Sequence, residues 1–260
     1  MARKISKQSR KQIAAFVRQA RHHADGGPLP DKRAAILRAY CEDVVEDDLL
    51  ASEPRYLANA VLSHLSWARN RSAGTAKVRV FNPQADRDGW HSDNTIVQIV
   101  NDDMPFLVDS LTMCLNELGR GIQITMHPIL RASRTRAGRL TDLKPSENGS
   151  AGKAESLIYM EIGKELDAGE LETVQRALES TLHDVRAAVE DWPAMLEELT
   201  AGRDHIQRHA PQQPGLLEES CALIDWLADD HFTLLGYREY KLSKGRDKDR
   251  LVPIAGTGLG

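Results

Sequence analysis

The first 75 residues show apolar positions spaced by three and four, the period of an amphipathic helix. The breaker Gly26-Gly27-Pro28 ends the first such stretch, and Pro30 and Pro54 stand before or at the start of the next two. We therefore predict three helices here, beginning near residue 7, after residue 30 and near residue 54. The first carries Ile13, Phe16, Val17 and Ala20 on one face. The acidic run at 46–48 is predicted to be a solvated end or loop.

The middle of the chain changes period and alternates between strand and helix patterns. The order is strand, helix, strand, strand, helix, over Thr95–Val100, Phe106–Leu118, Ile122–Leu130, Leu157–Ile162 and Glu170–Asp191. This order is the beginning of a ferredoxin-like βαββαβ unit. The predicted fold class is therefore α+β, with a helical amino-terminal segment followed by a ferredoxin-like unit and extra helices.

The pattern predicts three divisions of the chain. Residues 1–75 form the helical segment and residues 76–192 form the βαββα domain, which opens with a short strand at Val78–Phe81. Residues 193–260 form a helical extension with one or two strands, cut short at a glycine-rich end. Phe232–Leu242 is the candidate final strand. The pattern leaves open whether it completes the sheet or begins a further domain.

Several connections are also predicted. Residues 84–90 and 205–214 are polar and loop-like, and Ser133–Ala154 reads as a long, partly mobile hairpin connection. An apolar stripe runs from Leu171 to Leu199, and Pro193 is predicted to break or kink its helix. The stripe is explained either by ordinary core packing or by a helix at a subunit interface.

The composition excludes several classes of partner. A net charge of −4 and a pI near 6.2 give no reason to expect nucleic acid or an anionic membrane. No run approaches the roughly 18 apolar residues of a membrane span. The three separated cysteines suggest reduced thiols and a cytoplasmic protein. The first 24 residues include seven Lys or Arg residues and no Asp or Glu. This composition fits either a transit peptide or a basic helix packed on its own protein.

A search for a catalytic or metal-binding set finds none that we predict. The glycines at 256, 258 and 260 are only a partial dinucleotide-binding match. His205 and His209 have helical ligand spacing but no third ligand nearby. The clusters Asp102-Asp103 and Asp229-Asp230-His231 stand at predicted helix ends, where capping explains them.

The turn before the helix at residue 106 is the best candidate site. Asp103 is predicted to cap that helix, with Pro105 in its first turn. Backbone N–H groups at a helix start can hold a carboxylate or another anion. The alternative is a capped helix with nothing bound. The candidate effector-binding residues are Asn101, Asp103, Met104, Pro105, Phe106 and Leu107.

At this turn the sequence resembles known proteins. Asp103–Val108 resembles the opening of ACT domains, regulatory modules that often bind amino acids, and Asn101–Ser110 resembles the amino-terminal region of the large NAD-specific glutamate dehydrogenases. Three further stretches agree with that region: Val78–Pro83, Gly121–Pro128 and Phe232–Tyr240.

The resemblance implies a non-catalytic role for this chain. Members of the family convert L-glutamate, NAD and water to 2-oxoglutarate, ammonium and NADH, with a catalytic lysine and a dinucleotide-binding domain far downstream. The resemblance thus implies no catalytic residue, metal or cofactor in this chain, and NAD only in the parent enzyme. It implies homo-oligomers, contact with the rest of the same polypeptide, and an amino-acid effector. Phe106 stands where ACT domains usually have glycine, which crowds the ligand position and favours packing or subunit contact.

Three functions follow from these patterns. The first is a regulatory and assembly segment of the dehydrogenase, and the second is a purely structural oligomerisation scaffold without an effector. The third, an independent enzyme or a nucleic-acid binder, has only the basic stretch Arg3–Arg21 in its favour.

Overall fold

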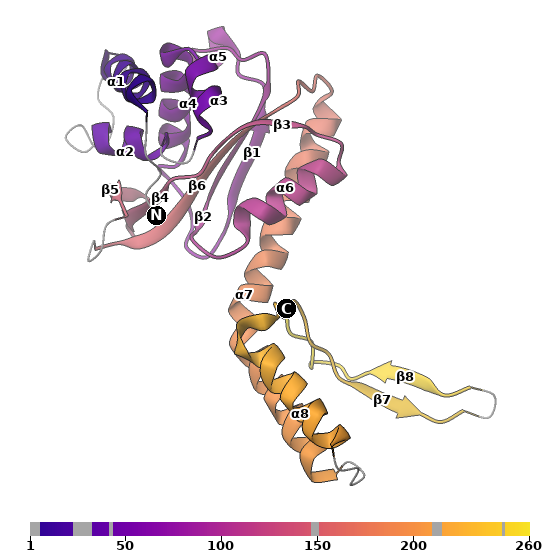
Figure 1. Cartoon of the computed structure of the whole chain (residues 1–260). Helices are drawn as coiled ribbons and strands as arrows, with labels where there is room; N and C mark the ends of the chain where they lie inside the picture. Colours follow the sequence, from indigo (N-terminus) through magenta and orange to yellow (C-terminus); the bar gives the residue numbers. More distant parts are fainter. Residues whose placement is uncertain (1–5, 23–32, 42–43, 147–150, 210–214, 246–247) are drawn as a thin grey trace. The chain divides into compact units, whose positions relative to one another are not determined.

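A computed structural model describes residues 6–22, 33–41, 44–146, 151–209, 215–245 and 248–260 (Figure 1). The chain forms two units, residues 1–182 and 183–260, and helix α7 (Ala168–His209) belongs to both. Each unit is described below by itself. The domain limits drawn from the sequence stay a prediction.

Four described helices precede the sheet in the first unit: α1 (Lys7–His22), α2 (Arg33–Ala39), α3 (Glu46–Ala51) and α4 (Pro54–Trp67). The predicted apolar face of α1 is confirmed, because all four of its residues are buried. Residues 46–48, predicted to be a solvated end or loop, are not a loop. These three acidic residues form the first turn of α3, where carboxylates interact favourably with the positive end of the helix dipole.

An antiparallel sheet of six described strands forms the centre of this unit (Figure 1). The strands are β1 (Lys77–Phe81), β2 (Thr95–Asp102), β3 (Ile122–Met126), β4 (Ile129–Arg134), β5 (Leu140–Pro145) and β6 (Lys153–Ile162). Their order is β1-β2-β6-β4-β5, and β3 also pairs with β6. The mixed α+β class predicted from the sequence is confirmed.

Both faces of the sheet are covered, which explains why every residue of β2 is buried. Ile96 and Val100 join the core formed by α1 to α4. Val97 and Ile99 point to the opposite face, where α6 (Leu107–Glu117) and the first part of α7 lie (Figure 1). The nearly continuous apolar run of this strand follows from burial on two sides.

The predicted single strand at 122–130 is two strands, and the predicted connection at 133–154 is wrong. His127 and Pro128 separate β3 from β4, because proline cannot donate a ladder hydrogen bond. β4 and β5 form a hairpin that buries Ala132 and Leu143. Residues 147–150, within the same predicted connection, lie outside the described residues.

Of the two effects predicted for Pro193, the break is wrong, because α7 continues through it to residue 209, and the kink stays a prediction. Pro193 is exposed, so water can satisfy the carbonyl that proline leaves without a helical partner. The predicted loop at 205–214 is therefore wrong for residues 205–209, and residues 210–214 lie outside the described residues. The predicted loop at 84–90 contains a single helical turn, α5 (Ala85–Asp88).

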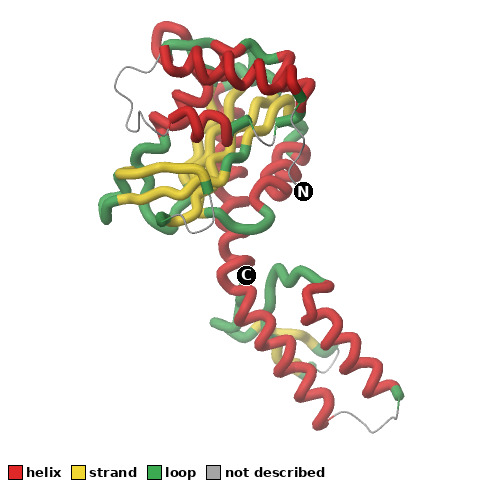
Figure 2. The backbone as a smooth tube through the Cα atoms, turned by 60° about the vertical axis from the view of Figure 1, so that its left-hand side comes forward, coloured by secondary structure: helices red, strands yellow, loops and turns green. Residues whose placement is uncertain are grey.

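The second unit contains the end of α7, α8 (Leu216–Trp226), the short segment η1 (Leu227–His231), β7 (Tyr240–Ser243) and β8 (Arg250–Pro253) (Figure 2). Only the end of the candidate strand 232–242 is extended in β7. That strand pairs with β8 in a separate two-stranded sheet, so it does not complete the larger sheet in the part of the chain described. The apolar residues of this hairpin are exposed.

Candidate functional site

The six predicted effector residues lie together on the turn between β2 and α6. Asn101 is fully buried in β2, and Leu107 is buried at the first position of α6. Between them, Asp103 and Met104 are half-buried, whereas Pro105 and Phe106 are exposed. The turn therefore has an inner side fixed in the protein and an outer side open to solvent.

The prediction that Asp103 caps α6 is wrong. The residue that precedes α6 is Phe106, and no side chain caps the helix. The Asp103 Oδ1 atom instead accepts a 2.8 Å hydrogen bond from the Ser156 hydroxyl on β6. Since that hydroxyl has one proton, its oxygen accepts from His127 Nε2 at 2.9 Å. Asp103 comes three residues too early to reach the helix start, so its carboxylate ties the turn to the sheet.

Phe106 adopts a backbone conformation that suits glycine. Its φ is 68° and its ψ is 0°, in the left-handed region. This conformation costs a residue with a Cβ atom about 1–2 kcal/mol. The position therefore keeps the backbone geometry of a glycine while carrying an aromatic side chain that is 47% exposed.

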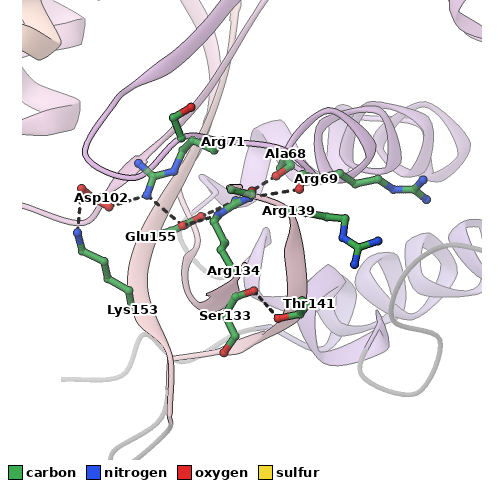
Figure 3. A network of polar contacts seen from close by, with 12 residues as sticks. Ala68, Arg69, Arg71, Asp102, Ser133, Arg134, Arg139, Thr141, Lys153 and Glu155 are labelled. Atoms are coloured by element: carbon green, nitrogen blue, oxygen red, sulfur yellow. Dashed lines mark hydrogen bonds and ion pairs between the residues drawn. The ribbon is translucent and has the colours of Figure 1, made fainter. Parts of the chain in front are cut away.

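A buried ionic network lies directly behind the turn (Figure 3). Arg71 Nη2 donates to Asp102 Oδ1 at 2.5 Å and to Glu155 Oε1 at 3.0 Å, and all three side chains are nearly inaccessible. Lys153 Nζ lies 3.0 Å from the other oxygen of Asp102. Burial by itself raises the pKa of the Asp102 carboxyl, but hydrogen bonds from Arg71 and Lys153 lower that pKa below its usual value.

Arg134 extends the network toward the helical segment. It donates hydrogen bonds to both carboxylate oxygens of Glu155, at 2.7 and 2.8 Å (Figure 3). It also donates to the carbonyl oxygens of Ala68 and Gly138, each at 3.0 Å. Two-pronged pairing of this kind fixes orientation as well as distance. The network therefore joins the end of α4, the β4–β5 hairpin and the candidate turn.

This network was missed by the sequence analysis. The only signals were the basic residues after α4 and the adjacent pair Asp102-Asp103, which was interpreted as capping. In the structure the two carboxylates have different partners: Asp102 accepts from Arg71, and Asp103 accepts from Ser156. Because all of these groups are engaged inside the protein, the network holds the turn in place and leaves only its outer side for a ligand.

The other candidate clusters remain local. The rings of His205 and His209 stack 4.3 Å apart on exposed positions of α7. His231 stacks on Trp226 and hydrogen-bonds the Trp226 carbonyl oxygen. Within the described ranges, no three His, Cys, Asp or Glu side chains gather as metal ligands would. Of the helices described, none has the length and apolar character needed to cross a membrane.

Comparison with known proteins gives consistent matches. Residues 36–178 match the family "Glutamate dehydrogenase, ACT1 domain". The chain is similar to NAD-specific glutamate dehydrogenases from Halomonas elongata (32% identity over 78% of this chain), Pseudomonas aeruginosa (36% over 68%) and Mycobacterium tuberculosis (26% over 75%). The matched region spans only 13%, 11% and 12% of the length of those relatives.

Proposed function

Because the chain belongs to the family of glutamate dehydrogenase ACT1 domains, we propose that it is the regulatory and assembly segment of an NAD-dependent glutamate dehydrogenase. The parent enzyme would convert L-glutamate, NAD and water to 2-oxoglutarate, ammonium and NADH. Its NAD site and catalytic residues would lie in other parts of the polypeptide. We propose a cytoplasmic homo-oligomer, in which this segment contacts the rest of its own chain.

The observation that carries the regulatory role is the construction of the turn at 101–107. Asp102 and Asp103 anchor its inner side through charged and hydroxyl partners. Pro105 and Phe106 leave its outer side exposed, next to the start of α6. An effector with a carboxylate would meet backbone N–H groups and the positive end of the helix dipole there.

We further propose that the first unit is a variant of the ferredoxin-like arrangement. In that arrangement the order of strands is 4-1-3-2, so the last strand lies beside the first. Here β2 corresponds to the first strand of that arrangement, the β3–β4 pair to the second and β6 to the third. The edge position beside the first strand, which the fourth strand occupies in that arrangement, is taken by β1. A strand from before the unit thus takes the position for which residues 232–242 were the candidate.

The alternative is a purely structural scaffold that binds no effector. The side chain of Phe106 favours it, since an aromatic ring occupies the position from which a glycine would let a ligand reach the backbone. The exposed side chains of Met113 on the neighbouring helix α6 and of Leu118 directly after it would then serve subunit contact.

Isothermal titration of the chain with glutamate, aspartate and arginine tests the regulatory role. We expect saturable heat of binding. We expect Asp103→Ala to weaken the affinity at least tenfold, because the turn loses its hydrogen bond to Ser156. Asp109→Ala is the matched control, since Asp109 is an exposed carboxylate in the first turn of the same helix. No heat from a folded and self-associated sample would favour the scaffold, and equal loss in both variants would argue against a site at the turn.

A further inference from the structure

A groove lies between α4 and the edge of the sheet, away from the candidate turn. Its volume is about 520 Å³, a size typical of small-molecule sites. It exists because β1 is an edge strand, so no further described strand covers this side of α4. The lining contains hydroxyl, amide, indole and charged side chains. They include Ser63, Ser66, Trp67, Arg79, Asp88 and Trp90.

Arg79 is held rigidly in this groove by neutral groups. It stands opposite Gln98 in the register of β1 and β2, and both its Nε and Nη2 donate to Gln98 Oε1. Nη2 also donates to the Ser63 hydroxyl of α4 at 2.9 Å. The guanidinium carbon lies 5.0 Å from the ring centre of Trp67 and 4.2 Å from that of Phe81. Gln98 and Ser63 contribute no charge, so the positive charge of Arg79 is held by dipoles and aromatic faces.

No carboxylate lies within ion-pair distance of Arg79 among the residues described, although the charge of Asp88 in the same groove acts on it. Its Nη1 atom also has no hydrogen-bond acceptor there, although the side chain is half-buried. Burial lowers the pKa of this guanidinium to about 10, a sign that its charge is poorly solvated. The neighbouring Lys77, by contrast, is satisfied in part by the Trp67 carbonyl oxygen at 2.6 Å. An anion at Nη1 would therefore remove an existing penalty.

Asp88 supplies a negative charge in the same groove. Its Oδ2 atom accepts from the Gln84 amide and from Arg87, whereas Oδ1 has no hydrogen-bond donor among the residues described. Trp67 and Trp90 add indole surface. Trp90 is only 5% exposed, and its Nε1–H has no acceptor among the residues that the structure describes. The groove thus offers one cation, one anion, hydroxyls and two apolar planes.

We propose that this groove binds a small zwitterion of the amino-acid type with an apolar side chain. Its carboxylate lies against Arg79 Nη1, and the hydroxyl of Ser66 is available in the lining. Its ammonium group faces Asp88 Oδ1, and its side chain packs on the two indoles. A dianion such as phosphate is disfavoured, because Arg79 is the one cation among the described lining residues and it faces a carboxylate in the same groove. The proposal rests on the proposed function, since it assigns the effector a class and a location other than the turn.

Tryptophan fluorescence tests this assignment. Of the four tryptophans, Trp67 and Trp90 line the groove, whereas Trp192 and Trp226 lie in residues 183–260. In a Trp192→Phe/Trp226→Phe background, we expect L-leucine, L-methionine or L-phenylalanine to change the emission saturably. We expect 4-methylpentanoate, which is leucine without its amine, to bind at least threefold more weakly, and 3-methylbutylamine not to bind.

Three variants locate the binding. Ser66→Phe fills the groove from an exposed position of α4, and Arg79→Gln removes the cation. Both are expected to weaken binding at least tenfold. Arg55→Gln is the matched control, because Arg55 is exposed on the same helix and does not line the groove. Circular dichroism and thermal melting confirm that each variant is folded.

The outcomes separate this inference from the proposed function. Binding lost in Ser66→Phe and Arg79→Gln, but kept in Asp103→Ala, supports the groove. Binding lost in Asp103→Ala and kept in Ser66→Phe overturns the groove while the regulatory role at the turn stands. A folded protein that responds to none of the three amino acids overturns the groove as well, and the scaffold then becomes the favoured function.

Discussion

Two arginines contact the same central strand in opposite ways. Arg71 reaches the carboxyl end of β2, where Asp102 and the neighbouring Glu155 neutralise its charge. Arg79 reaches the middle of β2, where it finds the neutral amide of Gln98 and no carboxylate within ion-pair distance among the described residues. Arg71 lies on the connection between α4 and β1, and Arg79 lies in β1 itself, yet only Arg71 is paired with carboxylates among the described residues.

The difference separates a structural charge from one available for binding. Burying a charge costs several kcal/mol unless partners replace its hydration. At Arg71 the protein supplies carboxylate partners itself, and the ion pairs of this network hold the end of α4 to the sheet. At Arg79 the partners are dipoles and ring faces, which leaves part of the cost uncompensated. That uncompensated part favours an anionic ligand.

The largest expected effect comes from the same substitution made at both arginines. Arg71→Met leaves Asp102 and Glu155 buried with one cation each, so we expect a loss of about 3 kcal/mol of unfolding free energy. Arg79→Met removes an unpaired charge and keeps the aliphatic contacts, so we expect a loss of about 1 kcal/mol. Urea unfolding of the two variants measures both values. Equal losses would show that the two arginines do not differ in this way.

A second test concerns His64 on α4, the residue next to Ser63, which Arg79 contacts. His64 is fully buried, and since its Nε2 faces the Ile99 carbonyl oxygen at 3.1 Å, the proton is on Nε2 and Tyr40 donates to Nδ1. Burial first, and then the charges of Arg79 and Lys77, lower its pKa to about 3, against the hydrogen bond to Ile99. The folded state therefore keeps His64 neutral, while the unfolded state takes up a proton below about pH 6.5.

Stability should accordingly fall as the pH drops through 6.5 and continue falling toward pH 3. Between pH 7 and pH 5 the contribution of His64 amounts to about 2 kcal/mol. His64→Gln keeps an N–H for the Ile99 carbonyl oxygen but does not titrate, so the variant should lack this part of the acid sensitivity. Urea unfolding of both proteins at the two pH values measures it. An identical pH dependence would mean that the His64 pKa is not lowered by its surroundings.

Substitutions at Phe106 test whether its left-handed backbone conformation is strained. Phe106 lies on the turn beside the Arg71 network. Glycine accepts a φ of 68° at no steric cost, whereas alanine does not. Phe106→Gly should therefore be more stable than Phe106→Ala by about 1 kcal/mol, because both lose the ring and only glycine relieves the backbone. Thermal unfolding of the two variants gives the difference. If alanine were the more stable, the turn could not hold this conformation in solution.

The smallest effect belongs to Lys153, the exposed end of the Arg71 network. Its side chain is 66% exposed, so its 3.0 Å contact with Asp102 is screened by water and salt. Lys153→Met should cost less than about 1 kcal/mol. The cost should shrink further when unfolding is repeated at high salt. A loss as large as that of Arg71→Met would mean that Asp102 depends on the lysine rather than on the arginine.

Much of the fold could be predicted because its signals are local. The face of α1, the buried run of β2 and the helix that begins at 107 each depend on periodicity within one segment. Errors occurred where distant contacts override local preference. The β4–β5 hairpin is polar and glycine-flanked in sequence, yet Leu143 and Ala132 are buried under the amino-terminal helices. Pro193 fits within α7 because its position is exposed.

The sequence by itself determined the α+β class, the family resemblance and the position of the turn at 101–107, since each depends on neighbouring residues along the chain. Only the tertiary structure decided which charges are paired. Arg71 meets Glu155 across 84 positions of sequence, and Arg79 meets Ser63 and Gln98 from two other elements. No periodicity encodes such meetings, because strand order and helix placement bring these side chains together only after the chain has folded.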